Sequence, residues 1–424
     1  MRHCYSLLSY LLTPFVLLRL WWRGKKAPQY RQRIAERFGY IELDAQSNSK
    51  PLLWLHAVSV GETMAAKPLI DELLQRYPGF RVLVTTTTPT GSAQLRRLYP
   101  DQVEHCYFPY DLPHVVSRFL SRVQPTLLIV METELWPNLY HQCATRKIPL
   151  LLANARLSSK SLRGYKKISR LIVPTLSKLN YLAAQSDVDL ERFLSLGANK
   201  EQSGVCGNLK YQLTIPQASL DLAAELRARV GERPVWVAAS THAGEDEIVL
   251  AAHKKLLKNH PTVLLLLVPR HPERFEEVAS LCQASGMSYV RRTAARMPAS
   301  TDVVWLIDSM GELLAMYGIS DFSFIGGSMV PTGGHNPLEA AAFGVASVMG
   351  PHTFNFSAVT QTMLSAQAIV QVDSVAELES TLEQWMTSSS IRSEIGAAAR
   401  QVLDDNLGAV SCLLEQVEKL VPKT

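Results

Sequence analysis

The sequence predicts an α/β protein with two doubly wound domains, each built around a parallel β-sheet. From Pro51 onward, short apolar runs alternate with amphipathic helical stretches, and the runs are continuously apolar, as in strands that helices cover on both faces. The alternation restarts after a break near residues 211–234, which indicates a second array of the same kind. The length of 424 residues also fits two or three domains.

Ten apolar runs are the candidate strands. The first array has them at residues 52–57, 81–86, 126–131, 149–153 and 181–184. The second array has them at residues 235–239, 263–268, 303–307, 322–325 and 346–349. We predict domains at 1–40, 41–215 and 216–424, and the last helices could cross back to the N-terminal domain. Doubly wound sheets bind ligands beyond the carboxyl ends of their strands, so functional residues are expected directly after these runs.

The first 40 residues combine an apolar stretch with most of the positive charge. They hold eight Lys or Arg residues against one acid, a net charge of +7 in a chain whose total is +5. Residues 5–22 form an apolar window with a single cation, which is marginal for a spanning helix of roughly 20 residues. A cleaved signal peptide fits poorly, because the strongest charge follows the apolar run.

Trp21 and Trp22 stand beside this basic flank, as in an interfacial anchor. We therefore expect a membrane-associated helix that spans the bilayer or lies on it. In either case the basic flank and the large domain after it lie on the cytoplasmic side. A buried core helix is the alternative.

The composition excludes several classes of protein. The 384 residues after the basic segment carry a net charge of −2, which argues against a nucleic-acid partner. A hydrophobic content of 47% excludes a disordered chain. Six scattered cysteines without a CxxC pair favour neither a disulfide scaffold nor a zinc site, and a reducing compartment is the simpler interpretation. The one D-x-D sequence, Asp187-Val-Asp189, is interpreted as a helix N-cap rather than a metal ligand.

Acidic side chains follow two strands of the first array. The segment 56–62 lacks the G-x-G-x-x-G of a dinucleotide-binding turn and ends in Glu62, which is either a general base or a helix N-terminal acid. Glu132 and Glu134 follow the run 126–131, and alternation along a strand would direct both carboxylates to one face. Such a pair needs a cation, and Lys210 is the candidate, although Lys210 could be solvated and Glu134 could simply precede the next helix.

The second array offers an anion site. Arg270 and His271 follow a buried strand and precede a helix, where a guanidinium, an imidazole and free helix N–H groups can bind an anion. The segment 308–313 repeats this arrangement after the next strand. Residues 326–334 contain four glycines and lead into Asn336, Pro337 and Glu339. These three fit a capping box, but the glycines also favour a loop whose amides bind the phosphate of a nucleotide.

Taken together, these segments resemble the 3-deoxy-D-manno-octulosonic acid (Kdo) transferases, glycosyltransferases of the GT-B fold that act in lipopolysaccharide biosynthesis. The resemblance rests on six segments that occur in the family's order. They are 56–62, 131–138, 207–210, 269–273, 309–313 and 333–339.

The resemblance implies two Rossmann-like domains that face each other across a cleft, with 41–215 binding the acceptor and 216–424 the nucleotide sugar. It also implies a CMP-Kdo donor, a lipid A precursor (lipid IVA) as acceptor, transfer with inversion, no metal and no cofactor. Glu62 would be the base, and Glu132 and Lys210 would stabilise the transition state. The residues that would hold CMP are Arg270, His271, Met310, Gly311, Glu312, Leu313, Asn336, Pro337, Leu338 and Glu339.

Two other functions share these features. A UDP-sugar transferase or sugar-nucleotide epimerase would keep the fold and change the donor. A membrane-tethered nucleotide-binding protein would have little use for carboxylates such as Glu62 and Glu132 near an anionic ligand.

Overall fold

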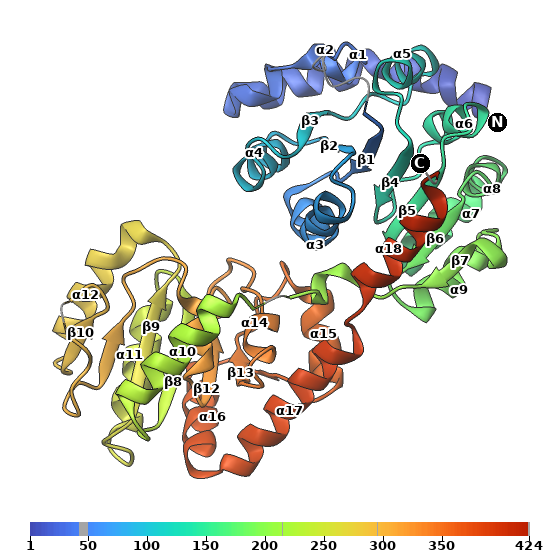
Figure 1. Ribbon diagram of the computed structural model, residues 1–424. Helices are drawn as coiled ribbons and strands as arrows, with labels where there is room; N and C mark the ends of the chain where they lie inside the picture. Colours follow the sequence, from blue (N-terminus) through green and yellow to red (C-terminus); the bar gives the residue numbers. More distant parts are fainter. Residues whose placement is uncertain (42–49, 214, 295, 423–424) are drawn as a thin grey trace. The chain divides into compact units, whose positions relative to one another are not determined.

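The computed structural model describes residues 1–41, 50–213, 215–294 and 296–422. The chain forms two compact units (Figure 1). The first unit contains Met1–Gln212 and the C-terminal segment from Leu407, and the second contains Leu213–Asn406.

A seven-stranded parallel sheet forms the centre of the first unit, in the order β3-β2-β1-β4-β5-β6-β7. Its strands are β1 (Leu52–His56), β2 (Arg81–Thr86), β3 (Glu104–Tyr107), β4 (Leu127–Met131), β5 (Leu150–Ala155), β6 (Tyr181–Ala184) and β7 (Ser203–Val205). The helices on one face are α5 (Pro113–Val123), α6 (Pro137–Thr145), α8 (Ser169–Leu176) and α9 (Asp187–Ser195). Those on the other face are α3 (Val60–Arg76), α4 (Pro89–Leu98) and α18 (Ala409–Leu420).

The remaining helical segments of the first unit lie at its start and in its connections. They are α1 (Arg2–Lys26), η1 (Pro28–Arg31), α2 (Ile34–Arg37), α7 (Ser159–Lys167), η3 (Lys200–Gln202) and η4 (Leu209–Tyr211). Within the described residues, α1 is the one helix long and apolar enough to cross a membrane by length and composition.

The second unit repeats this architecture with the strand order β10-β11-β9-β8-β12-β13-β14, again all parallel. Its strands are β8 (Val235–Thr241), β9 (Leu264–Pro269), β10 (Tyr289–Arg291), β11 (Val304–Leu306), β12 (Phe322–Ile325), β13 (Ala346–Met349) and β14 (Val370–Gln371). Its helices are α10 (Gln217–Val230), α11 (Glu245–Leu256), η5 (Pro272–Arg274), α12 (Phe275–Ala284), α13 (Leu313–Gly318), α14 (Leu338–Ala341), α15 (Ser357–Ser365), α16 (Val375–Thr387) and α17 (Ser389–Asp405).

The two parallel sheets confirm the predicted fold class, and all ten candidate runs are strands. The four strands that the pattern missed are β3, β7, β10 and β14, and each is the edge strand of its sheet. Edge strands here are two to four residues long and partly exposed, so they carry no continuous apolar run.

The C-terminal helix α18 carries a disulfide, whereas the sequence favoured reduced cysteines. It packs Leu413 and Val417 against the core of the first unit, and its Cys412 forms a disulfide with Cys206, 206 residues earlier. The sequence indicated no such pairing, because only the return of the chain to the first unit brings these two residues together.

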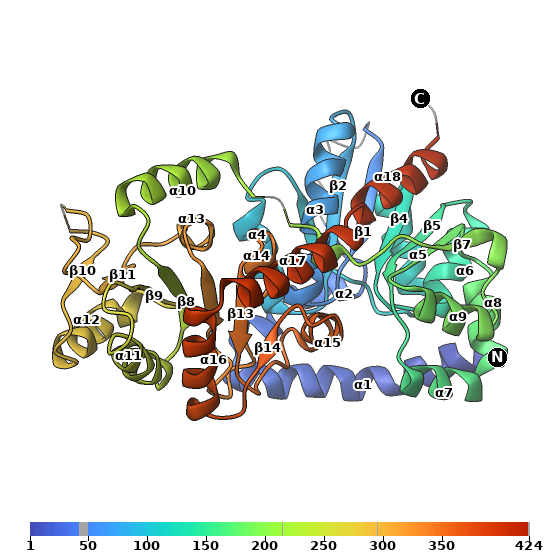
Figure 2. The ribbon, with the colours of Figure 1, turned by 90° about the horizontal axis from the view of Figure 1, so that it is seen from below.

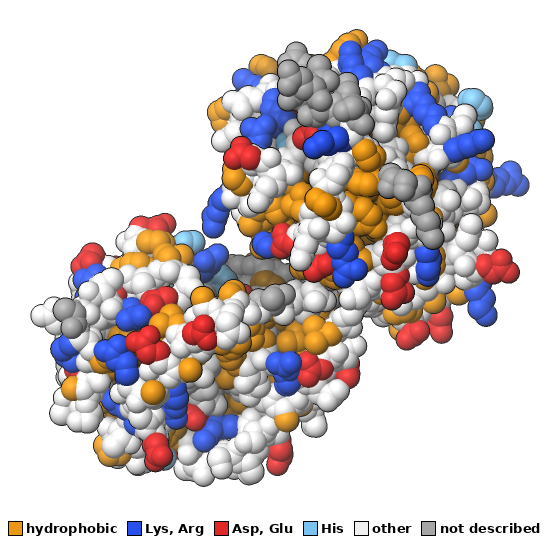
Figure 3. Space-filling view, viewed as in Figure 1, with side chains coloured by type: hydrophobic (Ala, Val, Ile, Leu, Met, Phe, Trp, Pro, Cys, Tyr) orange, Lys and Arg blue, Asp and Glu red, His pale blue; other side chains and the backbone are white. Residues whose placement is uncertain are grey.

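Charged side chains of both signs lie on the surface that Figure 3 shows. On the face that Figure 3 shows, Lys and Arg are interspersed with Asp and Glu over both units. Arg33 and Arg37, two of the N-terminal cations, bind groups within the first unit. Arg37 is buried and donates to the carbonyl of Thr87 at 2.9 Å, and Arg33 pairs with Glu36 at 2.6 Å.

Candidate active site

Glu62 lies in the first turn of α3, and its carboxylate completes the cap of that helix. Ser59 is the N-cap residue, and its hydroxyl accepts from the Glu62 N–H at 3.3 Å. One carboxylate oxygen of Glu62 accepts from the Ser59 hydroxyl at 3.1 Å and the other from the Val58 N–H at 2.8 Å. The side chain is partly buried, and burial raises its pKa, against the lowering effect of the Val58 N–H. The capping and general-base interpretations therefore describe the same positioned carboxylate.

Glu132 follows β4 and lies between two cations. One of its oxygens is 3.0 Å from Arg156 Nε, and the other is 3.8 Å from Lys210 Nζ. Glu132 has a φ of 56°, a left-handed conformation that is uncommon for a residue with a side chain and is often found at functional sites.

The alternation argument for Glu132 and Glu134 was wrong. Strand β4 ends at Met131, so both acids belong to the turn after it, and the positive φ of Glu132 breaks any period of two. The acids still form one cluster with Glu62. Burial, together with the charges of Glu62 and Glu132, raises the pKa of Glu134 to about 7.

Asn154 at the end of β5 organises the segment that carries Lys210. Asn154 is buried, has a φ of 54°, and its side-chain oxygen accepts from the Leu209 N–H at 3.0 Å. Asn208 Oδ1 accepts from the Lys210 N–H at 3.0 Å. Residue-type reasoning missed Asn154 and Arg156, although both stand at the end of a predicted strand, where ligand-binding residues were expected.

In the second unit the glycine-rich loop after β12 wraps around a buried carboxylate. Glu245 of α11 accepts from the N–H groups of Gly327, Ser328 and Met329 at 2.6, 3.0 and 2.9 Å, and from that of His242 at 3.0 Å. The prediction that the amides of this loop bind a phosphate is therefore wrong for these three amides, because a carboxylate already occupies them.

Arg270 and the histidines His242, His271 and His335 lie beyond β8, β9 and β12. His242 Nε2 is 2.8 Å from His335 Nε2, and the His242 ring also lies edge-on to His271. Burial lowers the pKa of His335 to about 4, and the charges of Arg270, His242 and His271 add to that effect. Arg270 and His271 are both exposed. An incoming anion therefore meets Arg270 and a set of imidazoles rather than backbone amides.

The predicted CMP turn 310–313 lies between strand β11 and helix α13. Gly311 has a φ of 87°, and Met310 is 57% exposed. Glu312 pairs with Arg292 at 2.8 Å, and Leu313 is the first residue of α13. The positive φ of Gly311 opens this turn without steric cost.

The capping box predicted at 336–339 differs in its details. Helix α14 begins at Leu338, so Asn336 is not its N-cap residue and Pro337 is not its first residue. Asn336 still binds this turn, since its oxygen accepts from the Leu338 N–H at 3.2 Å and its amide nitrogen donates to Glu339 at 3.4 Å. Burial raises the pKa of Glu339, whereas the nearby Arg270 lowers it.

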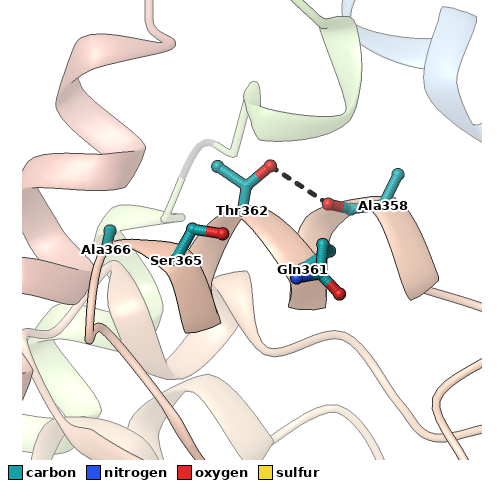
Figure 4. A pocket seen from close by; sticks show the side chains of 5 residues that line it. All are labelled: Ala358, Gln361, Thr362, Ser365 and Ala366. Carbon is teal, nitrogen blue, oxygen red and sulfur yellow. Dashed lines mark hydrogen bonds between the residues drawn. The ribbon is translucent and has the colours of Figure 1, made fainter.

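The predicted D-x-D sequence does not enter the site. Ser186, rather than Asp187, caps α9, and Asp189 accepts from the Leu157 N–H at 2.8 Å. Within the described residues, no group of three or more His, Cys, Asp or Glu side chains could hold a metal ion. A hollow beside α15 is lined by uncharged side chains (Figure 4). It contains none of the candidate residues.

Two parallel-sheet units, each with polar and titratable side chains beyond the carboxyl ends of its strands, are the architecture of the GT-B class. The family model described as "3-Deoxy-D-manno-octulosonic-acid transferase (kdotransferase)" matches residues 32–213. A 3-deoxy-D-manno-octulosonic acid transferase of Haemophilus influenzae is 44% identical over 98% of this chain and 97% of its own length. The chain belongs to the Kdo transferase family.

Two solved structures are also similar. The C-terminal CMP-Kdo binding domain of WaaA from Acinetobacter baumannii is 32% identical and covers 44% of this chain and 99% of its own, with a TM-score of 0.43. UDP-GlcNAc 2-epimerase from Neisseria meningitidis covers 87% of this chain and 100% of its own at 14% identity, with a TM-score of 0.54. The second likeness shows the fold alone.

Proposed function

We propose that this enzyme transfers Kdo from CMP-Kdo to a lipid A precursor, lipid IVA, with inversion at the sugar carbon. The observation that carries the proposal is the carboxylate cluster of the first unit. Glu62 is fixed by three contacts and has a raised pKa, and Glu132 beside it is held by Arg156 and Lys210.

The proposed step balances as a displacement. Glu62 takes the proton of the acceptor hydroxyl while the oxygen of that hydroxyl forms a bond to the anomeric carbon of Kdo. The bond from that carbon to the phosphate oxygen breaks, and CMP leaves with the electron pair. A raised pKa suits Glu62 to this role, because a stronger base removes a hydroxyl proton more readily near neutral pH.

Two groups of side chains suit the charges that would develop in the transition state. Positive charge develops on the sugar, and the carboxylate of Glu132 suits it, while Lys210 and Arg156 keep that carboxylate in one orientation. Negative charge develops on the leaving phosphate, and Arg270 and His271 suit it. The turns at 310–313 and 336–339 would bind the rest of CMP.

The place of action proposed for the enzyme is the cytoplasmic side of the inner membrane. The support is α1, with its tryptophans and basic flank, and an acceptor that is itself a lipid. Nucleic acid is not a partner in this proposal, and neither a metal nor a cofactor takes part.

The test replaces Glu62 by Gln, which keeps the size of the side chain and can still accept in the cap. Transfer of Kdo to lipid IVA, followed by mass analysis of the product lipid, should fall about 100- to 10,000-fold, while CMP still protects against thermal unfolding. Glu191→Gln, at an exposed position of α9, is the control and should keep full activity. Retained transfer by the Glu62 variant would exclude Glu62 as the base, and stronger protection by UDP than by CMP would favour a UDP-sugar enzyme.

A further inference from the structure

Helix α1 is fastened to the first unit at its N-terminal end by polar contacts. Asn138, at the start of α6, accepts with one side-chain oxygen from Arg2 at 3.2 Å and from Ser6 at 3.0 Å. The Asn138 amide nitrogen donates to the carbonyl of the buried Asp111 at 2.8 Å, and Tyr5 hydrogen-bonds to the Asp111 carboxylate.

Further contacts continue along the helix. Tyr10 stacks on His114, at the start of α5, and their polar atoms are 2.6 Å apart. At the other end, Arg31 of η1 folds back and donates to the carbonyl of Trp21 at 2.9 Å. Figures 1 and 2 show α1 lying along the side of the first unit, with its N-terminus beside α6.

The two faces of α1 are inverted relative to a helix that covers a protein core. The face toward the first unit carries polar side chains, among them Ser6, Ser9 and Thr13. The outward face is apolar, and each of its large side chains is 48–71% exposed. These side chains are Leu7, Leu8, Leu11, Leu12, Phe15, Leu18 and Trp22. Their spacing of three and four residues forms one stripe along the helix.

A spanning orientation is incompatible with these contacts. A helix of 25 residues is about 37 Å long, which exceeds the roughly 30 Å of a hydrocarbon core. A spanning α1 would therefore place its two ends on opposite sides of the membrane. Spanning would carry Arg2 and Ser6 to the opposite leaflet and away from Asn138. It would also separate Tyr5 from the buried Asp111.

We propose that α1 lies flat in the cytoplasmic leaflet, with its N-terminus on the cytoplasmic side and its apolar stripe in contact with anionic lipid. Charge as well as hydropathy favours anionic lipid, because the exposed Arg19, Arg23 and Lys25 lie beside the tryptophans at one end of the stripe. This inference rests on the proposed association with the membrane. It sets the depth of the first unit, because α1 fixes that unit at the lipid surface where a lipid acceptor is found.

Cross-linking tests the orientation of α1 in membranes. The pair Ser6→Cys and Asn138→Cys should form a disulfide on mild oxidation of membranes that contain the full chain. The pair Leu8→Cys and Asn138→Cys should not, because Leu8 is on the outward face. Kdo transfer, measured in the same membranes before oxidation, shows separately whether the proposed activity is intact.

A second measurement avoids the buried Asn138 and uses the native chain. Cys4 is the exposed free cysteine among the described residues, since Cys106, Cys143 and Cys282 are buried. A membrane-impermeant maleimide should leave Cys4 unlabelled in intact spheroplasts and label it after solubilisation in detergent. Labelling in intact spheroplasts would overturn the proposal even if transfer activity were normal.

The lipid contact has its own test. Leu11→Gln combined with Phe15→Gln should reduce flotation with vesicles of phosphatidylglycerol and phosphatidylethanolamine at least tenfold. Ser9→Ala, on the inward face, should leave flotation unchanged. Equal flotation of the two variants would refute the contact between the stripe and lipid.

Discussion

Replacing Glu245 by Gln should loosen the glycine loop of the second unit without altering its volume. Each carboxylate oxygen of Glu245 accepts from two N–H groups, one from His242 and Gly327 and the other from Ser328 and Met329. An amide offers one oxygen and one NH₂ group. Two of the four N–H groups would therefore face another donor.

The magnitude follows from these lost acceptors. A buried donor left without an acceptor costs about 1–3 kcal/mol, so two of them cost about 2–6 kcal/mol. Some of this cost is offset, because a neutral amide is less expensive to bury than the fully buried carboxylate of Glu245. We expect a net loss of about 2–4 kcal/mol in the free energy of unfolding of the second unit.

Urea unfolding combined with hydrogen exchange of peptides from the second unit measures this loss. Protection by CMP should fall as well, because the same loop continues into the turn at 336–339. Glu247→Gln, at an exposed position in the same turn of α11, is the matched control and should change stability by less than about 0.5 kcal/mol. The reasoning is refuted if the two variants unfold at the same urea concentration.

Two further predictions concern the first unit. Lys210→Met should lower the rate of transfer by about 10- to 100-fold with little change in CMP binding. Lys160→Met, at an exposed position of α7, is the control and should lower neither the rate nor CMP binding. Equal rates for the two variants would remove Lys210 from the mechanism. The folded-state pKa of Glu134 is about 7 against an ordinary value of 4.5. Between these values the folded state holds the proton that the unfolded state releases, so stability falls as pH rises through this window. Glu134→Gln should flatten that part of the stability profile, and an unchanged slope in urea titrations from pH 4.5 to 7 would contradict the assignment.

Sequence reasoning succeeded where burial dominates. The central strands, such as β4 and β9, are apolar along their whole length because helices cover both faces, and that pattern is readable without coordinates. Edge strands such as β3 and β14 are partly exposed. Their identity depends on a neighbouring strand, which a local pattern does not contain.

Some residues of the candidate site could also be predicted from the local sequence, and others could not. Glu62, Glu132 and Arg270 were predicted from their chemistry and their place after a strand. Glu245 was not, because an acid in the first turn of a helix is ordinary, and its partners lie 82 to 84 residues away in the chain.

Only the structure shows which of the N-terminal cations bind groups within the first unit. The count of +7 treated every cation in residues 1–40 as part of a membrane flank, but Arg33 and Arg37 bind groups inside the first unit. Removing residues 1–40 would therefore damage the fold of that unit as well as its attachment.

The return of α18 to the first unit determines when that unit can be completed during synthesis. Cys412 follows Cys206 by 206 residues, and at about 5–20 residues per second the ribosome needs about 10–40 s to travel between them. During that time the whole second unit is synthesised, while one face of the first sheet still lacks helix α18. A premature stop codon after residue 406 would therefore leave the second unit intact and expose the core of the first unit.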